Sequence, residues 1–230
     1  MCPGSPGRLS AVSPIPRWPA VIFDLDGTLV DTIPLILASF EHTLGTVLGS
    51  PRPEAEVRPW IGRRLGEVFE TEYPERAAEL EETYVAWNRA NAARLIGRFA
   101  GIPELLGALA QAQVRTGVAT SKRRETTAEA LEISGLTDLV DVAATAEDTT
   151  AHKPDPAPLL HAAARLSMPV QRCVYVGDAV VDVQAAQAAG MAAIAVTWGA
   201  GIRDSLAAAK PDHLVGTPEE LRAILLPPQR

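Results

Sequence analysis

The second half of this 230-residue chain alternates regularly between helical segments and short apolar segments. Three helical patterns, PELLGALAQAQ, RRETTAEALEISG and PAPLLHAAARL, are followed by the strand-like runs RTGVATS, DLVDVAATAED and CVYVGD. The segments VDVQAAQAAG and MAAIAVTWG repeat the pattern, and an earlier apolar run, AVIFDL, indicates a buried first strand. Such alternation is typical of a parallel sheet with crossover helices. We therefore predict an α/β fold, a doubly wound parallel sheet of the Rossmann-like kind.

The segment between the first strand and the alternating half has a different character. Residues 32–98 show helical patterns and no strand-like run, which predicts a helical cap inserted into a core made of residues 20–31 and 99–230. Residues 1–19 contain five prolines and no continuous apolar stretch, so we expect a flexible tail there.

Composition and charge narrow the possible partners. The net charge of −7 argues against a surface for nucleic acid or anionic lipid, which requires a basic face. No apolar run approaches the ~18 residues of a membrane-spanning helix. Two cysteines in the whole chain suit a reducing compartment. We expect a cytoplasmic protein, a monomer or a homodimer, with neither nucleic acid nor a membrane as partner.

Polar side chains gather where the predicted strands end. Ligands of doubly wound sheets bind beyond the carboxyl ends of the strands, so residues there are candidates for an active site. Four different strands supply acids, a hydroxyl and a lysine to this edge: Asp24, Asp26, Thr120, Ser121, Glu147, Asp148, Lys153, Gly177, Asp178 and Asp182.

The acids in this group indicate a particular chemistry. Asp24 and Asp26 are two apart in an extended segment, so their side chains leave the same face. Two carboxylates this close divide naturally into a nucleophile and a proton donor. Asp178 and Asp182 add negative charge that calls for a hard divalent cation, and Mg²⁺ prefers such oxygen ligands.

The lysine and the threonine complete a site for phosphoryl transfer. Lys153 can hold the nucleophile and a substrate phosphate together, and the Thr120 hydroxyl with nearby backbone N–H groups can take a phosphoryl oxygen. Phosphoryl transfer depends mostly on positioning and charge stabilisation, and carboxylate nucleophiles form aspartyl-phosphates. The residues therefore predict an enzyme for a small phosphorylated substrate.

Four motifs resemble those of the haloacid dehalogenase-like hydrolase superfamily, in the branch that includes phosphoglycolate phosphatases. They are DLDGT from Asp24, ATSK with Thr120, KPDP with Lys153, and GDAVVD, which ends at Asp182. The resemblance runs from about Ala20 to the end of the chain and is weakest in the insert.

The resemblance implies roles for individual residues. Asp24 would be the nucleophile and Asp26 the acid/base. Mg²⁺ would be held by the Asp24 side chain, the Asp26 carbonyl and Asp178, with Asp182 supporting that site directly or through water, although Asp182 could instead cap the following helix. Four positions depart from the family's commonest pattern without removing a catalytic group: Ala100, Ser121, His152 and Ala179.

Substrate contacts are expected from both parts of the chain. Gly27, Thr28 and Ser121 belong to the first two motifs, and Arg63 and Arg64 in the insert are candidates for binding the far end of the substrate. The expected activity is a Mg²⁺-dependent phosphatase, with phosphoglycolate as one candidate substrate.

Several other functions share part of this pattern. A sugar-phosphate mutase and an inorganic pyrophosphatase of the same superfamily remain open. The dehalogenase branch lacks an acid two residues after the nucleophile, and the phosphonate-cleaving branch needs a cap lysine, whereas no lysine precedes Lys122. A phospho-receiver signalling domain also combines these residue types, but Asp26 and the long insert argue against it.

Overall fold

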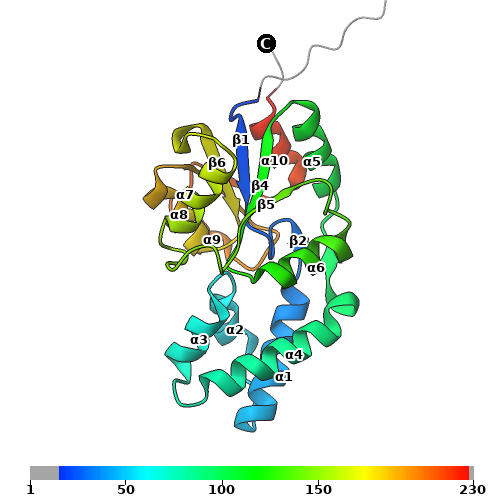
Figure 1. Ribbon diagram of the computed structural model, residues 1–230, viewed down its shortest axis with the longest axis vertical. Coiled ribbons are helices and arrows are strands. Elements are labelled where there is room, and N and C mark those ends of the chain that lie inside the picture. The colour runs from blue at the N-terminus through cyan, green and yellow to red at the C-terminus, as the bar shows by residue number, and fades with distance from the viewer. Residues whose placement is uncertain (1–15, 228–230) are drawn as a thin grey trace, which may run out of the picture.

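The computed structural model describes residues 16–227, and its centre is a six-stranded parallel sheet. The order of the strands is β5-β4-β1-β6-β7-β8, so β1 lies between strands that follow it much later in the sequence (Figure 1). The predicted doubly wound α/β fold is confirmed. The strands are β1 (Ala20–Phe23), β4 (Arg115–Ala119), β5 (Asp141–Ala144), β6 (Cys173–Gly177), β7 (Ala192–Val196) and β8 (His213–Val215).

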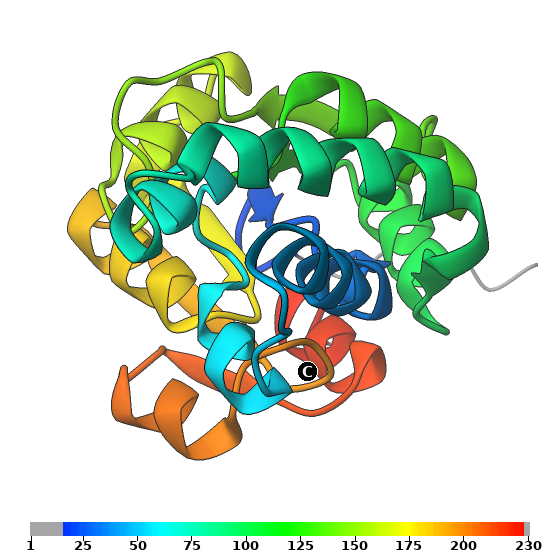
Figure 2. The same cartoon turned by 90° about the horizontal axis from the view of Figure 1, so that it is seen from below.

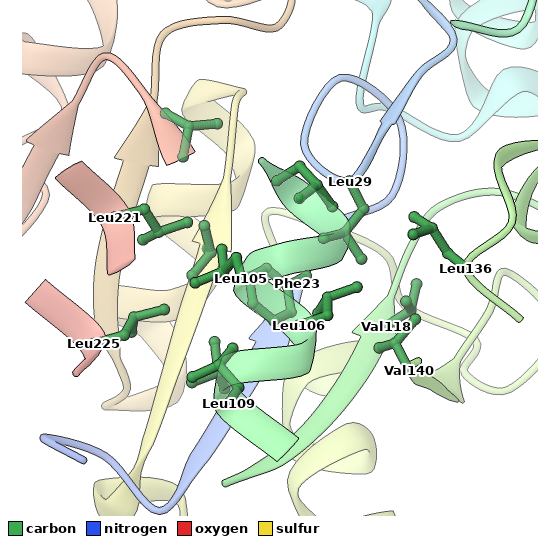
Figure 3. Close-up of a cluster of buried hydrophobic side chains, with 14 of the residues drawn as sticks. Phe23, Leu29, Leu105, Leu106, Leu109, Val118, Leu136, Val140, Leu221 and Leu225 are labelled. Atoms are coloured by element: carbon green, nitrogen blue, oxygen red, sulfur yellow. The ribbon is translucent and has the colours of Figure 1, made fainter. Parts of the chain in front are cut away.

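Helices cover both faces of the sheet because its strands are apolar on both sides. Val21 and Phe23 of β1 point into one hydrophobic cluster, and Ala20 and Ile22 point into the other. The first face is covered by α5 (Ile102–Gln111), α6 (Arg124–Ser134) and α10 (Pro218–Leu225). Figure 3 shows leucines of α5 and α10 in the same cluster as Phe23. The second face is covered by α7 (Ala157–Arg165), α8 (Val180–Ala189) and α9 (Arg203–Ala208).

The inserted segment forms a separate group of helices at one end of the molecule (Figure 1). It is joined to the sheet by two short antiparallel strands, β2 (Val30–Asp31) and β3 (Gly97–Arg98). Between them lie α1 (Ile33–Leu48), α2 (Glu54–Val57), a 3₁₀ turn (Arg58–Trp60), α3 (Leu65–Glu72) and α4 (Ala77–Leu95). The longest two, α1 and α4, pack against each other and are seen from the cap end in Figure 2.

The cap has a hydrophobic core of its own. Phe40 of α1 is at its centre, with its ring centroid 5.3 Å from that of Trp60 and 4.9 Å from that of Tyr84. The aromatic pairs are tilted or edge-to-face, which is the favourable arrangement for such rings. This core keeps the four cap helices together as one packed unit beside the carboxyl edge of the sheet.

The structure departs from the sequence-based expectation in three places. Residues 16–19 of the expected tail are folded: the Arg17 N–H donates to the Leu225 carbonyl, and Trp18 packs on the core. Gly97 and Arg98 belong to residues 32–98, where no strand was expected, and they pair with β2 as a strand. The six-residue helix α9 was not expected. Within the described residues 16–227, no helix combines the length and the apolar character needed to cross a membrane.

Candidate active site

The first strand delivers Asp24 to the centre of the sheet's carboxyl edge. The Asp24 N–H donates to the Val176 carbonyl of the neighbouring strand β6, so the ladder still holds the backbone at this residue. After Asp26 the chain turns through Gly27, whose φ of +76° is unfavourable for other residues. A side chain at Gly27 would also collide with Asp178, because its Cβ would lie 2.3 Å from Asp178 Oδ2. The sequence DLDG therefore ends the strand and brings the backbone of Gly27 close to the Asp178 carboxylate.

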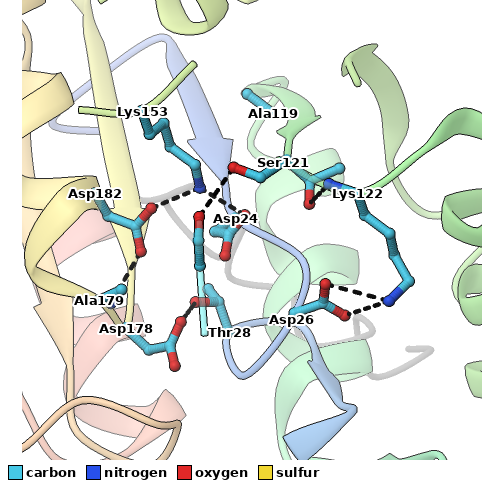
Figure 4. A network of polar contacts seen from close by, with 12 residues as sticks. Asp24, Asp26, Thr28, Ala119, Ser121, Lys122, Lys153, Asp178, Ala179 and Asp182 are labelled. Carbon is cyan, nitrogen blue, oxygen red and sulfur yellow. Dashed lines mark hydrogen bonds and ion pairs between the residues drawn. The ribbon is translucent and has the colours of Figure 1, made fainter. Parts of the chain in front are cut away.

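Lys153 is the centre of a buried network behind Asp24. Its ammonium lies 2.9 Å from Asp24 Oδ1 and 2.6 Å from Asp182 Oδ1 (Figure 4). It also donates to the Tyr175 hydroxyl at 3.1 Å. The Tyr175 hydroxyl in turn donates to the Ala119 carbonyl at 2.7 Å, so its oxygen lone pairs face the lysine. All three ammonium protons thus have acceptors, and the position of Lys153 is fixed from three sides.

Asp182 has two partners that account for its burial. Besides Lys153, its carboxylate accepts the Ala179 N–H at 2.9 Å, at the first turn of α8. An acidic group at this position satisfies a free helix N–H and complements the helix dipole. Both roles considered from the sequence are therefore compatible with its place: Asp182 caps α8 and also lies beside Asp24 and Asp178.

Asp178 is buried without a cation next to it in the described residues. Its carboxylate accepts the Thr28 hydroxyl at 3.2 Å and the Ala200 N–H at 2.6 Å. Gly199 allows this close approach, because a Cβ there would lie 2.2 Å from Asp178 Oδ2. Two hydrogen bonds orient the carboxylate but do not neutralise its charge.

The pKa values of this cluster show an unbalanced charge. Burial raises the pKa of Asp24 to about 7, although the nearby Lys153 ammonium opposes the shift. Burial and the charges of Asp182 and Asp24 raise the pKa of Asp178 well above its ordinary value. Burial alone would lower the pKa of Lys153, but Asp182 and Asp24 raise it well above the ordinary value. Three carboxylates share one ammonium.

These residues fit a hard divalent cation. Asp24, Asp178 and Asp182 each offer a carboxylate oxygen, and the three oxygens lie within 4.8 Å of one another. With Lys153 counted, two negative charges remain uncompensated in a buried place, where such charge is costly. Mg²⁺ has the charge and the oxygen preference to match this group, and it would favour the ionised form of the Asp24 carboxylate.

Asp26 lies on the other side of Asp24 and has a different lysine as partner. Lys122 Nζ is 3.1 Å from Asp26 Oδ1 and 3.3 Å from Oδ2. Figure 4 shows Lys153 reaching Asp24 from one side and Lys122 reaching Asp26 from the other. The two acids therefore occupy different environments, as a division of labour requires.

A cavity of about 160 Å³ lies between the edge of the sheet and the cap. Asp24, Asp26, Thr120 and Ser121 form part of its wall on the core side, and Arg63 and Arg64 form part of its wall on the cap side. Lys153, Asp178 and Asp182 stand behind Asp24 and do not line it. A substrate in this cavity would meet the Asp24 carboxylate and the Thr120 hydroxyl directly.

Ser121, Arg63 and Arg64 lie where the core meets the cap. The Ser121 hydroxyl donates to the Gly62 carbonyl at 2.9 Å, so it links the core to the cap. Arg63 pairs with Glu67, one turn along α3, at 2.9 Å. Arg64 makes no ion pair with any residue between 16 and 227. Burial lowers the pKa of His152, and the charge of the Arg64 guanidinium lowers it further. Arg64 therefore lies near the loop that carries Lys153.

Gly27 and Thr28 are brought to Asp178 and not to the cavity. The Gly27 N–H donates to the Val30 carbonyl, and the Thr28 N–H donates to the Leu25 carbonyl. Both amides are therefore occupied within the turn, and neither residue lines the cavity. Both residues lie against Asp178, and the substrate contact expected for them stays a prediction. Glu147 and Asp148 also lie outside the cavity wall.

Three contributors to the site were missed in the sequence. Lys122 follows Thr120 and Ser121 at the end of β4, and this position was the available signal. Tyr175 is within the apolar run CVYVG, where it resembles any core aromatic residue. The Ala200 amide belongs to the segment TWGAG, and no side-chain pattern announces a backbone donor.

Comparison with known proteins gives consistent matches over most of the chain. Residues 21–196 match the family described as haloacid dehalogenase-like hydrolase. Pyrophosphatase PpaX of Bacillus velezensis is 34% identical over 199 residues, which cover 86% of this chain and 92% of that protein. A hydrolase from Bacteroides fragilis, provisionally described as haloacid dehalogenase-like, superposes with a TM-score of 0.82 at 26% identity, over 89% of this chain and 100% of that chain. A Lactobacillus plantarum structure, provisionally described as a phosphoglycolate phosphatase, gives 0.79 at 25% identity, over 90% and 99%.

Proposed function

Since the chain belongs to the haloacid dehalogenase-like hydrolases, we propose that it is a Mg²⁺-dependent phosphatase that works through an aspartyl-phosphate on Asp24. The observation that carries this proposal is the pairing of Asp24 with the buried Lys153 at 2.9 Å. Asp24 and Asp26 both line the cavity. A carboxylate held this way can attack phosphorus in line, and phosphoryl transfer depends on such positioning.

The first half of the proposed reaction moves the phosphoryl group to the enzyme. An Asp24 oxygen forms a bond to phosphorus while the bond between phosphorus and the leaving-group oxygen breaks. Asp26 gives its proton to that oxygen, which an alkoxide needs because it is a poor leaving group. Lys153 holds the attacking carboxylate, and the Thr120 hydroxyl, which lines the cavity, is available to a phosphoryl oxygen.

The second half releases inorganic phosphate. Asp26, now ionised, takes a proton from a water molecule, whose oxygen attacks the phosphorus of the aspartyl-phosphate. The bond between phosphorus and Asp24 breaks, and both acids return to their starting states. The metal ion, held by Asp24 and Asp178 with Asp182 beside them, would supply charge neutralisation for the transferred phosphoryl group.

The cap is part of the proposed mechanism because its residues form one side of the cavity. Ser121 and Gly62 connect the core to the cap across the cavity wall, and a closed cavity keeps bulk water from the aspartyl-phosphate until the leaving group departs. Residues 32–98 are proposed to act as this cap and to select the substrate.

Two small anions are the candidate substrates. Inorganic pyrophosphate is favoured by the relatives at 33–34% identity, which are named pyrophosphatases. Phosphoglycolate is suggested by the motifs and by the name of the Lactobacillus plantarum structure. A cytoplasmic location and a monomeric or homodimeric state stay predictions from the sequence.

Phosphate release under multiple turnover tests the proposal. With Mg²⁺ present, the enzyme should release many equivalents of phosphate from at least one of these anions, whereas a receiver domain would stop after one and a mutase would retain the group. Dialysis against EDTA should abolish release, and added Mg²⁺ should restore it. Asp24→Asn should be inactive. Undiminished activity in metal-free enzyme would contradict the mechanism.

A further inference from the structure

The cap helix α4 presents a row of side chains to the cavity. They are spaced by three and four positions, which places them on one face of the helix, and they are Glu81, Tyr84, Val85, Asn88 and Arg89. Asp24 and Asp26 belong to the core side of the same cavity. A substrate with its phosphoryl group at Asp24 therefore extends its leaving group into the space in front of this face of α4.

The charged residues on this face already have partners. Glu81 pairs with Arg123 and Arg89 pairs with Glu125, so both pairs join α4 to the core. Asn88 differs from them because it carries no charge and is only 6% exposed. It takes part neither in these ion pairs nor in the proposed reaction.

The hydrogen bonds around Asn88 determine which end of its amide is left for the cavity. The Ser39 hydroxyl donates its single proton to the Leu35 carbonyl at 2.7 Å, so Ser39 Oγ can only accept from Asn88. The Asn88 amide nitrogen donates to Ser39 Oγ at 3.0 Å. Ser39 is fully buried and does not line the cavity, whereas Asn88 does. The amide nitrogen is therefore engaged inside the cap, and the amide oxygen is the polar end that remains for a ligand.

This oxygen has no donor within the described part of the chain. No N–H or O–H group of residues 16–227 donates to Asn88 Oδ1. Neighbouring wall residues such as Ile36, Phe40 and Val85 are apolar and cannot donate from their side chains. A leaving group that fills the cavity displaces water from the oxygen, and an acceptor that loses water without gaining a donor is costly. A leaving group that brings its own donor avoids this cost.

From this geometry we infer that Asn88 is a specificity-determining residue whose amide oxygen accepts a hydrogen bond from a hydroxyl group of the leaving alcohol. The substrate class is a phosphate monoester whose alcohol carries a second hydroxyl, with its carbon atoms against the apolar part of the wall. An ionised carboxylate, as in phosphoglycolate, offers only further acceptors to this oxygen. This inference rests on the proposed function and goes beyond its two candidate anions.

Matched esters separate the hydroxyl from the size of the leaving group. Hydroxyalkyl phosphates with a terminal hydroxyl and chains of two, three or four carbons are each compared with the alkyl phosphate in which a methyl group replaces that hydroxyl. The wild-type enzyme should prefer the hydroxyl ester of at least one pair by roughly fivefold or more in kcat/KM, the usual effect of leaving a buried acceptor unpaired. In Asn88→Leu, which removes the oxygen and nearly keeps the side-chain size, this ratio should fall by roughly the same factor.

A second asparagine on the same helix provides the matched control. Asn91 lies three residues further along α4, does not line the cavity, and donates to the Trp87 carbonyl at 2.9 Å. Asn91→Leu should therefore leave the ratio of the two kcat/KM values at its wild-type level. Asn88→Ala is a second variant without the oxygen, should leucine fit poorly beside Ser39, and it should lose the preference as well.

Two results would overturn the inference. One is a wild-type enzyme that prefers the hydroxyl ester in none of the pairs. The other is equal loss on both members of a pair in the two Asn88 variants, which would mean that Asn88 only supports the packing of α4. Failure of the proposed function would look different, because the wild-type enzyme would then release phosphate neither from the esters nor from the two candidate anions with Mg²⁺ present.

Discussion

The two lysine–aspartate pairs of the site differ in how much water reaches them. In the pair of Lys153 and Asp24 the side chains are 1% and 2% exposed, whereas in the pair of Lys122 and Asp26 they are 13% and 14% exposed. The first lysine has two further partners and the second has none in the described residues. The acids concerned are separated by a single residue, Leu25, so the difference comes from what the fold places around them.

This difference matches the two chemical tasks proposed for Asp24 and Asp26. A nucleophile must stay in one place while phosphorus approaches, and a buried lysine with three acceptors gives Asp24 that rigidity. A general acid/base must change its protonation state twice per cycle, and Asp26 lies at the cavity wall, where protons and substrate reach it. The buried pair of Lys153 and Asp24 is therefore suited to holding a nucleophile in place. The pair of Lys122 and Asp26, in the cavity wall, is suited to the exchange of a proton.

The largest expected effect comes from breaking the buried pair. Lys153→Met would leave Asp24, Asp178 and Asp182 without their ammonium. We expect phosphate release to fall by roughly 10²–10³ or more, the usual loss when a charge-stabilising donor is removed from a site. We also expect the free energy of unfolding of the metal-free protein to fall by about 3–5 kcal/mol, because buried carboxylates lose their partner. Urea denaturation followed by circular dichroism measures the second quantity.

The same substitution in the other pair is the matched comparison. Lys122→Met should lower the free energy of unfolding by at most about 2 kcal/mol, because water and the cavity moderate the loss of a charged hydrogen bond. Equal destabilisation by the two substitutions would show that the pairs do not differ in the way their burial indicates.

A smaller effect concerns the positive charge that the buried carboxylates Asp24 and Asp178 lack in the metal-free protein. Burial raises the pKa of Asp178 well above its ordinary value and that of Asp24 to about 7, so the folded metal-free protein holds protons that the unfolded chain has lost. Between the ordinary aspartate pKa and these raised values, the stabilising contribution of both groups decreases as pH rises. The melting temperature of Asp178→Asn minus that of the wild type should therefore increase from pH 5 to pH 7.5.

Thermal melts in EDTA at both pH values provide the measurement. Added Mg²⁺ should raise the melting temperature of the wild type more than that of Asp178→Asn, because binding to the folded state stabilises it. A relative melting temperature that does not change with pH would argue against an uncompensated carboxylate at this position.

The sequence predicted the layout of the core well because periodicity and strand ends are local signals. The alternating segments gave the parallel sheet, and the residues after its strands include Asp24, Asp26, Lys153 and Asp178, which the structure brings together. The two-residue strands β2 and β3 have no local signal, since they exist only because Val30 and Arg98 meet across the insert.

The contacts of individual side chains were less accessible to sequence reasoning. The partner of Lys122 depends on β4 lying next to β1, a tertiary pairing that aligns Phe23 with Val118. Arg63 and Arg64 looked equivalent in the sequence, but the helix start at Leu65 brings Glu67 to Arg63 and leaves Arg64 without an ion-pair partner in residues 16–227. Such distinctions follow from packing and not from composition.

The most direct test of the account is whether Asp24 carries the phosphoryl group. Asp26→Asn should react with nitrophenyl phosphate in a burst of one nitrophenol per enzyme followed by a slow phase, because nitrophenolate leaves without an acid while the second half still needs a base. The slow phase should be reduced by the 10²–10⁴ typical of general acid–base catalysis. Intact mass during the burst should show one added phosphoryl group, which is absent when Asp24 is also changed to Asn. A variant with no burst and no added mass, and with equal losses on natural and activated esters, would contradict the account.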